Sequence, residues 1–96
     1  MQVKVEYLGH VRGYVGNKRV EEIEVEENSS IVDLLLVLGK KYGDLFKRSV
    51  YEPKGADVKS NYIITVNGYL LNQLRGIMTK LNAGDKIVIL PIVSGG

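Results

Sequence analysis

The residues with the clearest chemical potential are the last two, Gly95 and Gly96, which close the stretch PIVSGG. Glycine has no side chain, so a Gly-Gly end forms a thin, flexible strand that can enter a narrow channel. From Pro91 to Gly96 the extended chain reaches roughly 20 Å, far enough to carry the Gly96 carboxylate into the active site of another protein. The alternative is an ordinary loose end, because chain ends are usually variable.

The chemistry available to this end starts from a carboxylate, which is a poor electrophile until it is joined to a leaving group such as AMP. A sulfur or nitrogen nucleophile can then attack the activated carbonyl carbon. The chain has no Walker A motif for binding ATP and no cysteine to supply sulfur. If Gly96 is activated, we therefore expect a partner enzyme to do it.

Composition restricts the other classes of function. The chain has 96 residues, which suits one domain, and 45% of them are hydrophobic, which argues against disorder. The net charge of +2 is too balanced to indicate nucleic-acid binding. The longest apolar stretch, IVDLLLVLG, is too short to cross a bilayer. We expect a cytoplasmic protein that binds no metal, cofactor, nucleic acid or membrane, since it also lacks cysteine ligands and a secretion signal.

Local patterns predict the elements that must position the C-terminal end. Alternation predicts strands at 3–7 and 20–27, joined by a long, mobile loop over 9–19. Within NSSIVDLLLVLGKKYG, an apolar stripe at helical spacing predicts an amphipathic helix, with a capping box from Ser30 to Asp33 and an end at Gly43. For the irregular segment that follows this helix, a short second helix is one alternative.

The second half of the chain contains the clearest turn signal. Asn67-Gly68 separates two apolar runs and predicts a type I′ hairpin. The segment 72–81 is expected to be a helical or 3₁₀ connection before a last strand at 86–90. Alternation in that strand places Ile87 and Ile89 on one face, and Val88 and Leu90 on the other. We therefore predict an α+β domain over 1–90, followed by a flexible tail over 91–96.

Other polar residues have structural explanations. His10 is the one histidine of the chain and lies in the expected loop, so we interpret it as a polar loop residue. Strand alternation accounts for most of the glutamates between Glu21 and Glu27. Arg75 is interpreted as solvated, with contact to a partner's carboxylate as the alternative.

The complete pattern resembles the ubiquitin-like β-grasp sulfur carriers. It is most similar to the small subunit of molybdopterin synthase in its archaeal form, which grades into the archaeal ubiquitin-like small modifiers. The resemblance covers nearly the whole chain and rests on SIVDLLLVLGKKYG, ITVNG and GIMTKLNAGDKIVILPIVSGG. One departure is Pro91-Ile92, where the family commonly has two prolines. The implied fold is a β-grasp: a mixed sheet of four to five strands with one main helix on one face.

The resemblance also implies a mechanism. An E1-like adenylating enzyme, using ATP and magnesium, activates Gly96, and a sulfur donor converts the acyl-adenylate to a thiocarboxylate. The tail then enters the large subunit of molybdopterin synthase, where its sulfur attacks a cyclic pterin precursor in molybdenum cofactor biosynthesis. Gly96 is the reacting residue in this scheme, and Gly95 and Ser94 form the tail. Partner contact is expected from the residues around the end of the last strand: Val88, Leu90, Pro91, Ile92 and Val93.

Three alternatives stay open at this point. The same acyl-adenylate can react with lysines of target proteins, which makes the chain a protein modifier. The carrier can instead deliver sulfur to tRNA or, less readily given its length, to a thiazole. Finally, the domain can be an interaction module whose tail is never activated. For Leu90, the expected role as an exposed apolar anchor competes with cover by its own domain.

Overall fold

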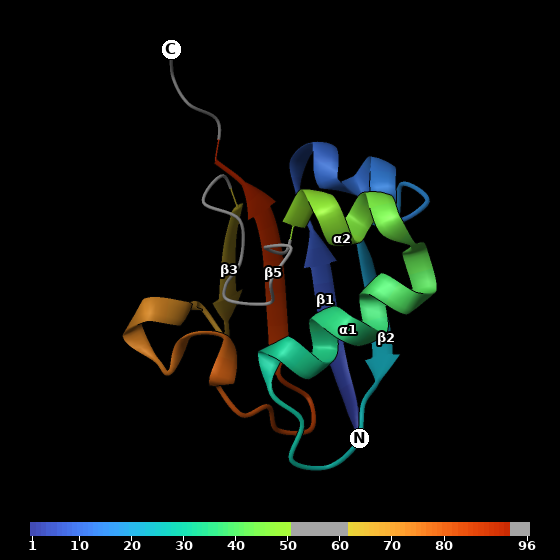
Figure 1. Ribbon diagram of the computed structural model, residues 1–96. Coiled ribbons are helices and arrows are strands. Elements are labelled where there is room, and N and C mark those ends of the chain that lie inside the picture. Colours follow the sequence, from blue (N-terminus) through green and yellow to red (C-terminus); the bar gives the residue numbers. More distant parts are fainter. Residues whose placement is uncertain (51–61, 93–96) are drawn as a thin grey trace.

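The computed structural model describes residues 1–50 and 62–92. This part of the chain forms one mixed sheet in the order β2-β1-β5-β3-β4, with α-helices on one face (Figure 1). The expected α+β class is confirmed. No helix among the described residues is long and apolar enough to cross a bilayer. The elements are β1 Gln2–Tyr7, η1 Gly9–Tyr14, β2 Val20–Glu24, α1 Ile31–Tyr42, α2 Asp44–Val50, β3 Tyr62–Val66, β4 Tyr69–Leu70, η2 Leu71–Gln73, η3 Gly76–Met78 and β5 Lys86–Pro91, where η denotes a 3₁₀ helix.

The core lies between the sheet and the two α-helices. β5 is the central strand of the sheet, parallel to β1 on one side and antiparallel to β3 on the other. Ile87 and Ile89 of β5 are fully buried, as the alternation predicts. The predicted stripe of α1 covers the same face of the sheet, and its members are all buried: Ile31, Leu34, Leu35 and Leu38.

Helix α1 begins and ends where the sequence predicts. The Ser30 amide donates a hydrogen bond to Asp33 Oδ2 at 2.8 Å, which satisfies a backbone donor at the start of the helix. This bond and a second one from the Ser30 hydroxyl lower the pKa of Asp33. Gly43 follows the last turn at φ +91°, a conformation that residues with a side chain rarely adopt.

Gly39, inside α1, permits the close approach of α2. A Cβ atom at this position would lie 2.6 Å from Cγ of Lys47 on α2. The cost of glycine in a helix interior, roughly 1 kcal/mol relative to alanine, is therefore offset by this contact between the two helices.

The predicted hairpin at Asn67-Gly68 is also confirmed. Both residues have positive φ, at 53° and 89°, as a type I′ turn requires. The Asn67 side chain accepts a hydrogen bond from the Lys86 amide at 2.9 Å and donates one to Asp85 Oδ1 at 2.9 Å. These bonds connect the hairpin to the beginning of β5.

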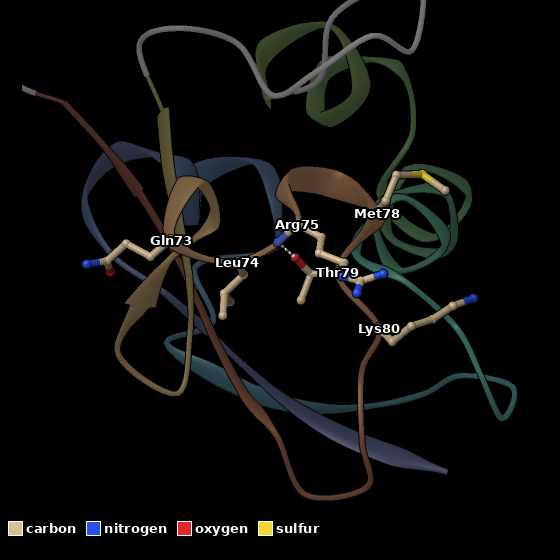
Figure 2. Close-up of a pocket in the computed structure, with 6 residues that line it drawn as sticks. All are labelled: Gln73, Leu74, Arg75, Met78, Thr79 and Lys80. Carbon is tan, nitrogen blue, oxygen red and sulfur yellow. Dashed lines mark hydrogen bonds between the residues drawn. The ribbon is translucent and has the colours of Figure 1, made fainter.

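The connection from β4 to β5 contains η2 and η3, in agreement with the predicted 3₁₀ connection. Thr79 fixes the path of this connection, because its hydroxyl accepts a hydrogen bond from the Arg75 amide at 3.0 Å (Figure 2). The same hydroxyl donates a hydrogen bond to the Gly76 carbonyl at 2.7 Å. The Thr79 carbonyl then accepts a hydrogen bond from the Ile31 amide at 3.0 Å. The connection is thus attached to the beginning of α1.

The prediction of a long, mobile loop over 9–19 was wrong. Residues Gly9–Tyr14 form η1, and Val11 and Val15 are both fully buried. Three glycines in this segment concealed two apolar residues four positions apart, which attach it to the core. Burial of these valines, at about 1.5–3 kcal/mol each, explains why the segment folds against the sheet.

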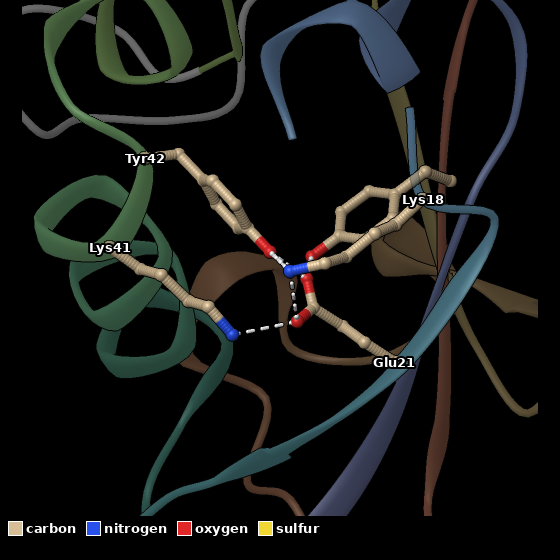
Figure 3. A network of polar contacts seen from close by, with 5 residues as sticks. Lys18, Glu21, Lys41 and Tyr42 are labelled. Carbon is tan, nitrogen blue, oxygen red and sulfur yellow. Dashed lines mark hydrogen bonds and ion pairs between the residues drawn. The ribbon is translucent and has the colours of Figure 1, made fainter. Parts of the chain in front are cut away.

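Glu21 departs from the pattern of solvated glutamates on β2. It shares the helix side of the sheet with Ile23, and its carboxylate accepts hydrogen bonds from Lys41 Nζ at 2.8 Å, from the Tyr7 hydroxyl at 2.7 Å and from the Tyr42 hydroxyl (Figure 3). Burial raises the pKa of Glu21, but these three donors outweigh it and lower the pKa to about 2. The network connects the end of α1 to the edge strand β2.

Candidate functional site

The candidate site begins at the end of β5, where the sheet gives way to the C-terminal residues. Pro91 is the last residue of the strand and pairs with Tyr62 of β3, one position beyond the predicted domain boundary at 90. On the other side, the Leu8 amide donates a hydrogen bond to the Ile89 carbonyl at 3.0 Å. Neighbours on both sides therefore fix the direction in which the chain leaves the sheet.

Gly9 permits the close packing around Pro91. It adopts φ +71°, and a Cβ atom there would lie 2.8 Å from Cγ of Pro91. Real side chains essentially never approach that closely, so the beginning of η1 can contact Pro91 only through a glycine. Sequence reasoning treated this glycine as part of a mobile loop and missed its role.

His10 lies in η1 beside the same strand end and contacts two tyrosines. Its Nε2 is 3.1 Å from the Tyr62 hydroxyl, and its ring meets the rings of Tyr62 and Tyr14 edge-on at centroid distances of 5.9 Å and 6.4 Å. Burial, followed by the charge of Tyr14, raises the pKa of Tyr62. His10 is exposed, as expected of a polar residue, but it lies in η1 and belongs to an aromatic cluster beside Pro91, so the expectation of a mobile loop is corrected.

Two of the predicted partner-binding residues of β5, Val88 and Leu90, lie on the face of the sheet opposite the α-helices, here called the open face, whereas alternation places Pro91 on the side of Ile87 and Ile89. Val88 lies between Glu6 of β1 and Thr65 of β3 in the strand register, and Leu90 is opposite Ile63. Both Val88 and Leu90 are half-buried. Leu90 is therefore neither a fully exposed anchor nor fully covered, because its neighbours in the sheet shield part of its side chain.

Exposed apolar side chains extend the open face towards both edges of the sheet. Leu70 pairs with Thr65 at the β4 edge and is 39% exposed, and Val20 pairs with Glu6 at the β2 edge and is 47% exposed. Ile92, directly after β5, is also 47% exposed. Glu6 separates Val20 from the other apolar residues, so the apolar row of the open face lies over β5, β3 and β4 and consists of Val88, Leu90, Ile63 and Leu70. Partly exposed apolar side chains gathered in this way are typical of an interaction surface.

One ion pair lies within the open face. Lys86 Nζ is 3.1 Å from a carboxylate oxygen of Glu6, and Glu6 is the register neighbour of Val88. Both side chains are partly exposed, so the pair contributes little to stability. This ion pair places one positive and one negative charge beside the apolar row, where a partner can contact them.

The reacting end itself lies outside the described residues. The predicted roles of Val93, Ser94, Gly95 and Gly96 therefore stay predictions. Among residues 1–50 and 62–92, no group of three or more His, Asp or Glu side chains is placed to hold a metal ion. The described part of the site is thus a fixed strand end beside an apolar face.

Comparisons with known proteins agree with this geometry. The ThiS family matches residues 5–96. Small archaeal modifier protein 3 of Haloferax volcanii is 27% identical over 96 residues, which cover all of both chains. The solved structure of small archaeal modifier protein 1 from Methanosarcina acetivorans is 29% identical, with a TM-score of 0.78 over 99% of this chain and 96% of that one. A putative molybdopterin converting factor, subunit 1, from Pyrococcus furiosus is 27% identical, with a TM-score of 0.74 over 97% and 99%.

These likenesses confirm the predicted ubiquitin-like β-grasp fold, since both solved structures match nearly the full length of the chain. They also confirm the resemblance to small archaeal modifiers and ubiquitin-like sulfur carriers.

Proposed function

The chain belongs to the ThiS family, and we propose that it is a sulfur carrier whose reacting group is the C-terminal carboxylate of Gly96. The observation that supports this most strongly is the position of β5. Its end at Pro91 is fixed in the middle of the sheet, and the sequence then continues for five residues to Gly-Gly. Such an arrangement presents a slender reactive end from a rigid body.

The proposed chemistry has two steps, both performed by partners. An E1-like adenylating enzyme with ATP and Mg²⁺ joins the Gly96 carboxylate to AMP, and pyrophosphate leaves. A sulfur nucleophile then attacks the carbonyl carbon, AMP leaves, and a thiocarboxylate results. This chain supplies the carboxylate, while Gly95 and Ser94 supply a narrow approach to the enzyme. We place the reaction in the cytoplasm, which suits a chain without cysteine.

The acceptor of the sulfur is proposed to be a cyclic pterin precursor, with this chain as the small subunit of molybdopterin synthase. The Pyrococcus furiosus relative is named a putative molybdopterin converting factor subunit, which supports this choice. In this scheme the large subunit provides the pterin pocket, and the tail enters it. Two deliveries of sulfur complete the dithiolene that binds molybdenum.

The open face is proposed to receive these partners. Leu90, Val88 and Pro91 lie next to the point where the tail begins, and Ile92 and Val93 continue from it. A partner that covers the apolar row gains hydrophobic energy at roughly 25 cal/mol per Å² and aligns the tail with its own active site.

Deletion of Gly96 tests the proposal. The deleted chain is expected to keep its fold, because the described core ends at Pro91, and to accept no sulfur from the purified activating enzyme. A chain with Gly13→Ala, far from the reacting end in sequence, serves as the matched control. Full sulfur transfer by the Gly96 deletion would contradict the proposal.

A second candidate function is protein modification, in which a lysine amine attacks the same acyl-adenylate and forms an isopeptide bond. Two of the relatives carry the name small archaeal modifier protein, which favours this candidate. Because the last tryptic site is Lys86, the remnant IVILPIVSGG on lysines of other proteins after tryptic digestion would establish it.

A further inference from the structure

A groove lies beyond the β4 edge of the sheet, away from the end of β5. It is open, has a volume of about 700 Å³, and is formed by residues of η2, η3 and the segment that follows (Figure 2). In Figure 1 this part of the chain is at the end of the sheet where β5 begins, whereas Pro91 is at the other end. The residues of the groove are Gln73, Leu74, Arg75, Met78, Thr79 and Lys80.

The groove combines apolar and cationic side chains. Leu74 and Met78 are 38% and 61% exposed, and Arg75 and Lys80 carry positive charge. Lys80 Nζ donates a hydrogen bond to the Asn28 carbonyl at 2.9 Å. Within the described part of the chain, no carboxylate lines the groove and neither cation belongs to an ion pair. An occupant with both a carboxylate and a large apolar side chain would complement it.

The backbone beneath the groove is already fixed. Thr79 is bonded to the Arg75 amide and to the Gly76 carbonyl, and the Leu81 amide donates to the Ser29 carbonyl at 2.8 Å. A ligand therefore has to order only the exposed side chains, which reduces the entropy lost on binding. Methionine suits such a surface because its flexible side chain adapts its shape to a partner. Arginine suits it because its guanidinium binds a carboxylate in a bidentate manner.

We propose that this groove docks an acidic, partly apolar segment of the enzyme that activates Gly96. This inference rests on the proposed function. A Gly-Gly end has no side chains that distinguish one carrier from another. The activating enzyme must therefore recognise residues of the folded domain. Leu70 joins the groove to the open face, since it pairs with Thr65 and directly precedes η2. One enzyme surface can therefore cover both regions.

A protein segment fits the groove better than nucleic acid does. Sites for single-stranded nucleic acid stack bases on aromatic side chains, whereas the groove offers Leu74 and Met78.

The distance between the groove and the reacting end also defines the expected kinetic effect of losing the groove contacts. Lys86 and Pro91 are separated by five steps of β5, roughly 17 Å. We expect contacts so far from the carboxylate to stabilise the bound ground state and the transition state equally, so that their loss raises KM and leaves kcat unaltered.

The test is ATP–pyrophosphate exchange by the purified activating enzyme, with the full chain as substrate. Arg75→Glu combined with Lys80→Glu is expected to raise KM about tenfold or more without changing kcat. The control, Lys40→Glu combined with Arg48→Glu, makes the same change in net charge on exposed residues of α1 and α2. We expect its KM to stay within twofold. Met78→Ser, which alters no charge, is expected to raise KM about threefold.

The possible outcomes distinguish a failure of the groove inference from a failure of the proposed function. Normal exchange with an unchanged KM for the groove variants would overturn this inference and leave the proposed function intact. No exchange with the unaltered chain would contradict the proposed function and this inference with it. Binding of fluorescent oligouridine that is lost in Arg75→Glu with Lys80→Glu, at unchanged KM, would assign the groove to nucleic acid and also overturn the proposal. Matching unfolding midpoints for all variants exclude misfolding as the cause of a raised KM.

Discussion

At the scale of single residues, Gly9 connects the fold to the proposed reaction. Its positive φ and the 2.8 Å approach of a Cβ atom to Pro91 make substitution unfavourable for two separate reasons. We expect Gly9→Ala to reduce the free energy of unfolding by about 1–3 kcal/mol and to shift the NMR signals of Leu90 and Ile92. Urea unfolding and a comparison of amide spectra measure both effects.

Two other glycines in the same segment are matched controls for Gly9. Gly16 has φ +68° and, among the described residues, nothing within 4 Å of an added Cβ, so Gly16→Ala isolates backbone strain. Gly13 has open space and no positive φ, so Gly13→Ala is expected to be nearly neutral. Equal stability of Gly9→Ala and Gly13→Ala would contradict the role assigned to Gly9.

Glu21 gives a prediction about pH. Its pKa is about 2 in the folded chain, below its ordinary value of 4.5. A lowered pKa means that Glu21 stabilises the fold fully above pH 4.5 and loses this contribution as the pH falls towards 2. At pH 7, Glu21→Gln is expected to cost about 1.5–3 kcal/mol, in the range of hydrogen bonds to charged groups.

The measurement is urea unfolding of Glu21→Gln and the parent chain from pH 7 to pH 2. The difference between them should shrink across pH 4.5 to 2. Glu22→Gln, an exposed residue of the same strand, serves as the control and should differ little from the parent. A constant difference over the whole range would show that Glu21 is not held as a carboxylate by Tyr7, Tyr42 and Lys41.

At the scale of elements, β5 and its open face make a prediction about partner binding. Leu90→Ala combined with Ile92→Ala is expected to weaken binding to the activating enzyme about tenfold or more, because both side chains lie where the tail begins. Isothermal titration with the purified enzyme measures the affinity. Leu36→Ala is the control, since Leu36 is 48% exposed on α1, which lies on the helical side of the sheet. Equal affinities for the two variants would contradict docking on the open face.

The elements also show how far sequence reasoning reaches. The stripe of α1, the capping box and the Asn67-Gly68 turn are local signals, and each is confirmed. The parity of β2 could also have identified Glu21, because it lies two positions from the buried Ile23. By contrast, η1 was missed because Val11 and Val15 are surrounded by turn-forming residues, and their burial depends on a distant part of the sheet.

The same limit applies to the site. Alternation placed Val88 and Leu90 on the face opposite Ile87 and Ile89, as observed. The cluster of Gly9, His10 and Tyr62 around Pro91 joins residues more than fifty positions apart, and no local pattern specifies it. The groove likewise depends on how η2 and η3 fold against the start of α1.

At the scale of the whole molecule, the described residues form a folded body that is proposed to position a chemically simple end. The sheet fixes Pro91, the open face lies beside it, and the groove gives a second region for recognition. In the proposed reaction, the residues of these regions bind partners, and the partners perform the chemical steps. Under the proposed function, a chain without cysteine can carry sulfur because it contributes only one carboxylate and the surfaces that partners recognise.

The most direct test of the central claim is the mass of the C-terminal peptide. The chain would be tagged at its N-terminus and recovered from its own host under non-reducing, alkylating conditions. The account predicts a peptide in which sulfur replaces one carboxylate oxygen of Gly96, captured as its alkylated thiocarboxylate. A plain carboxylate in every molecule, even after incubation with the activating enzyme, ATP and a sulfur donor, would contradict it.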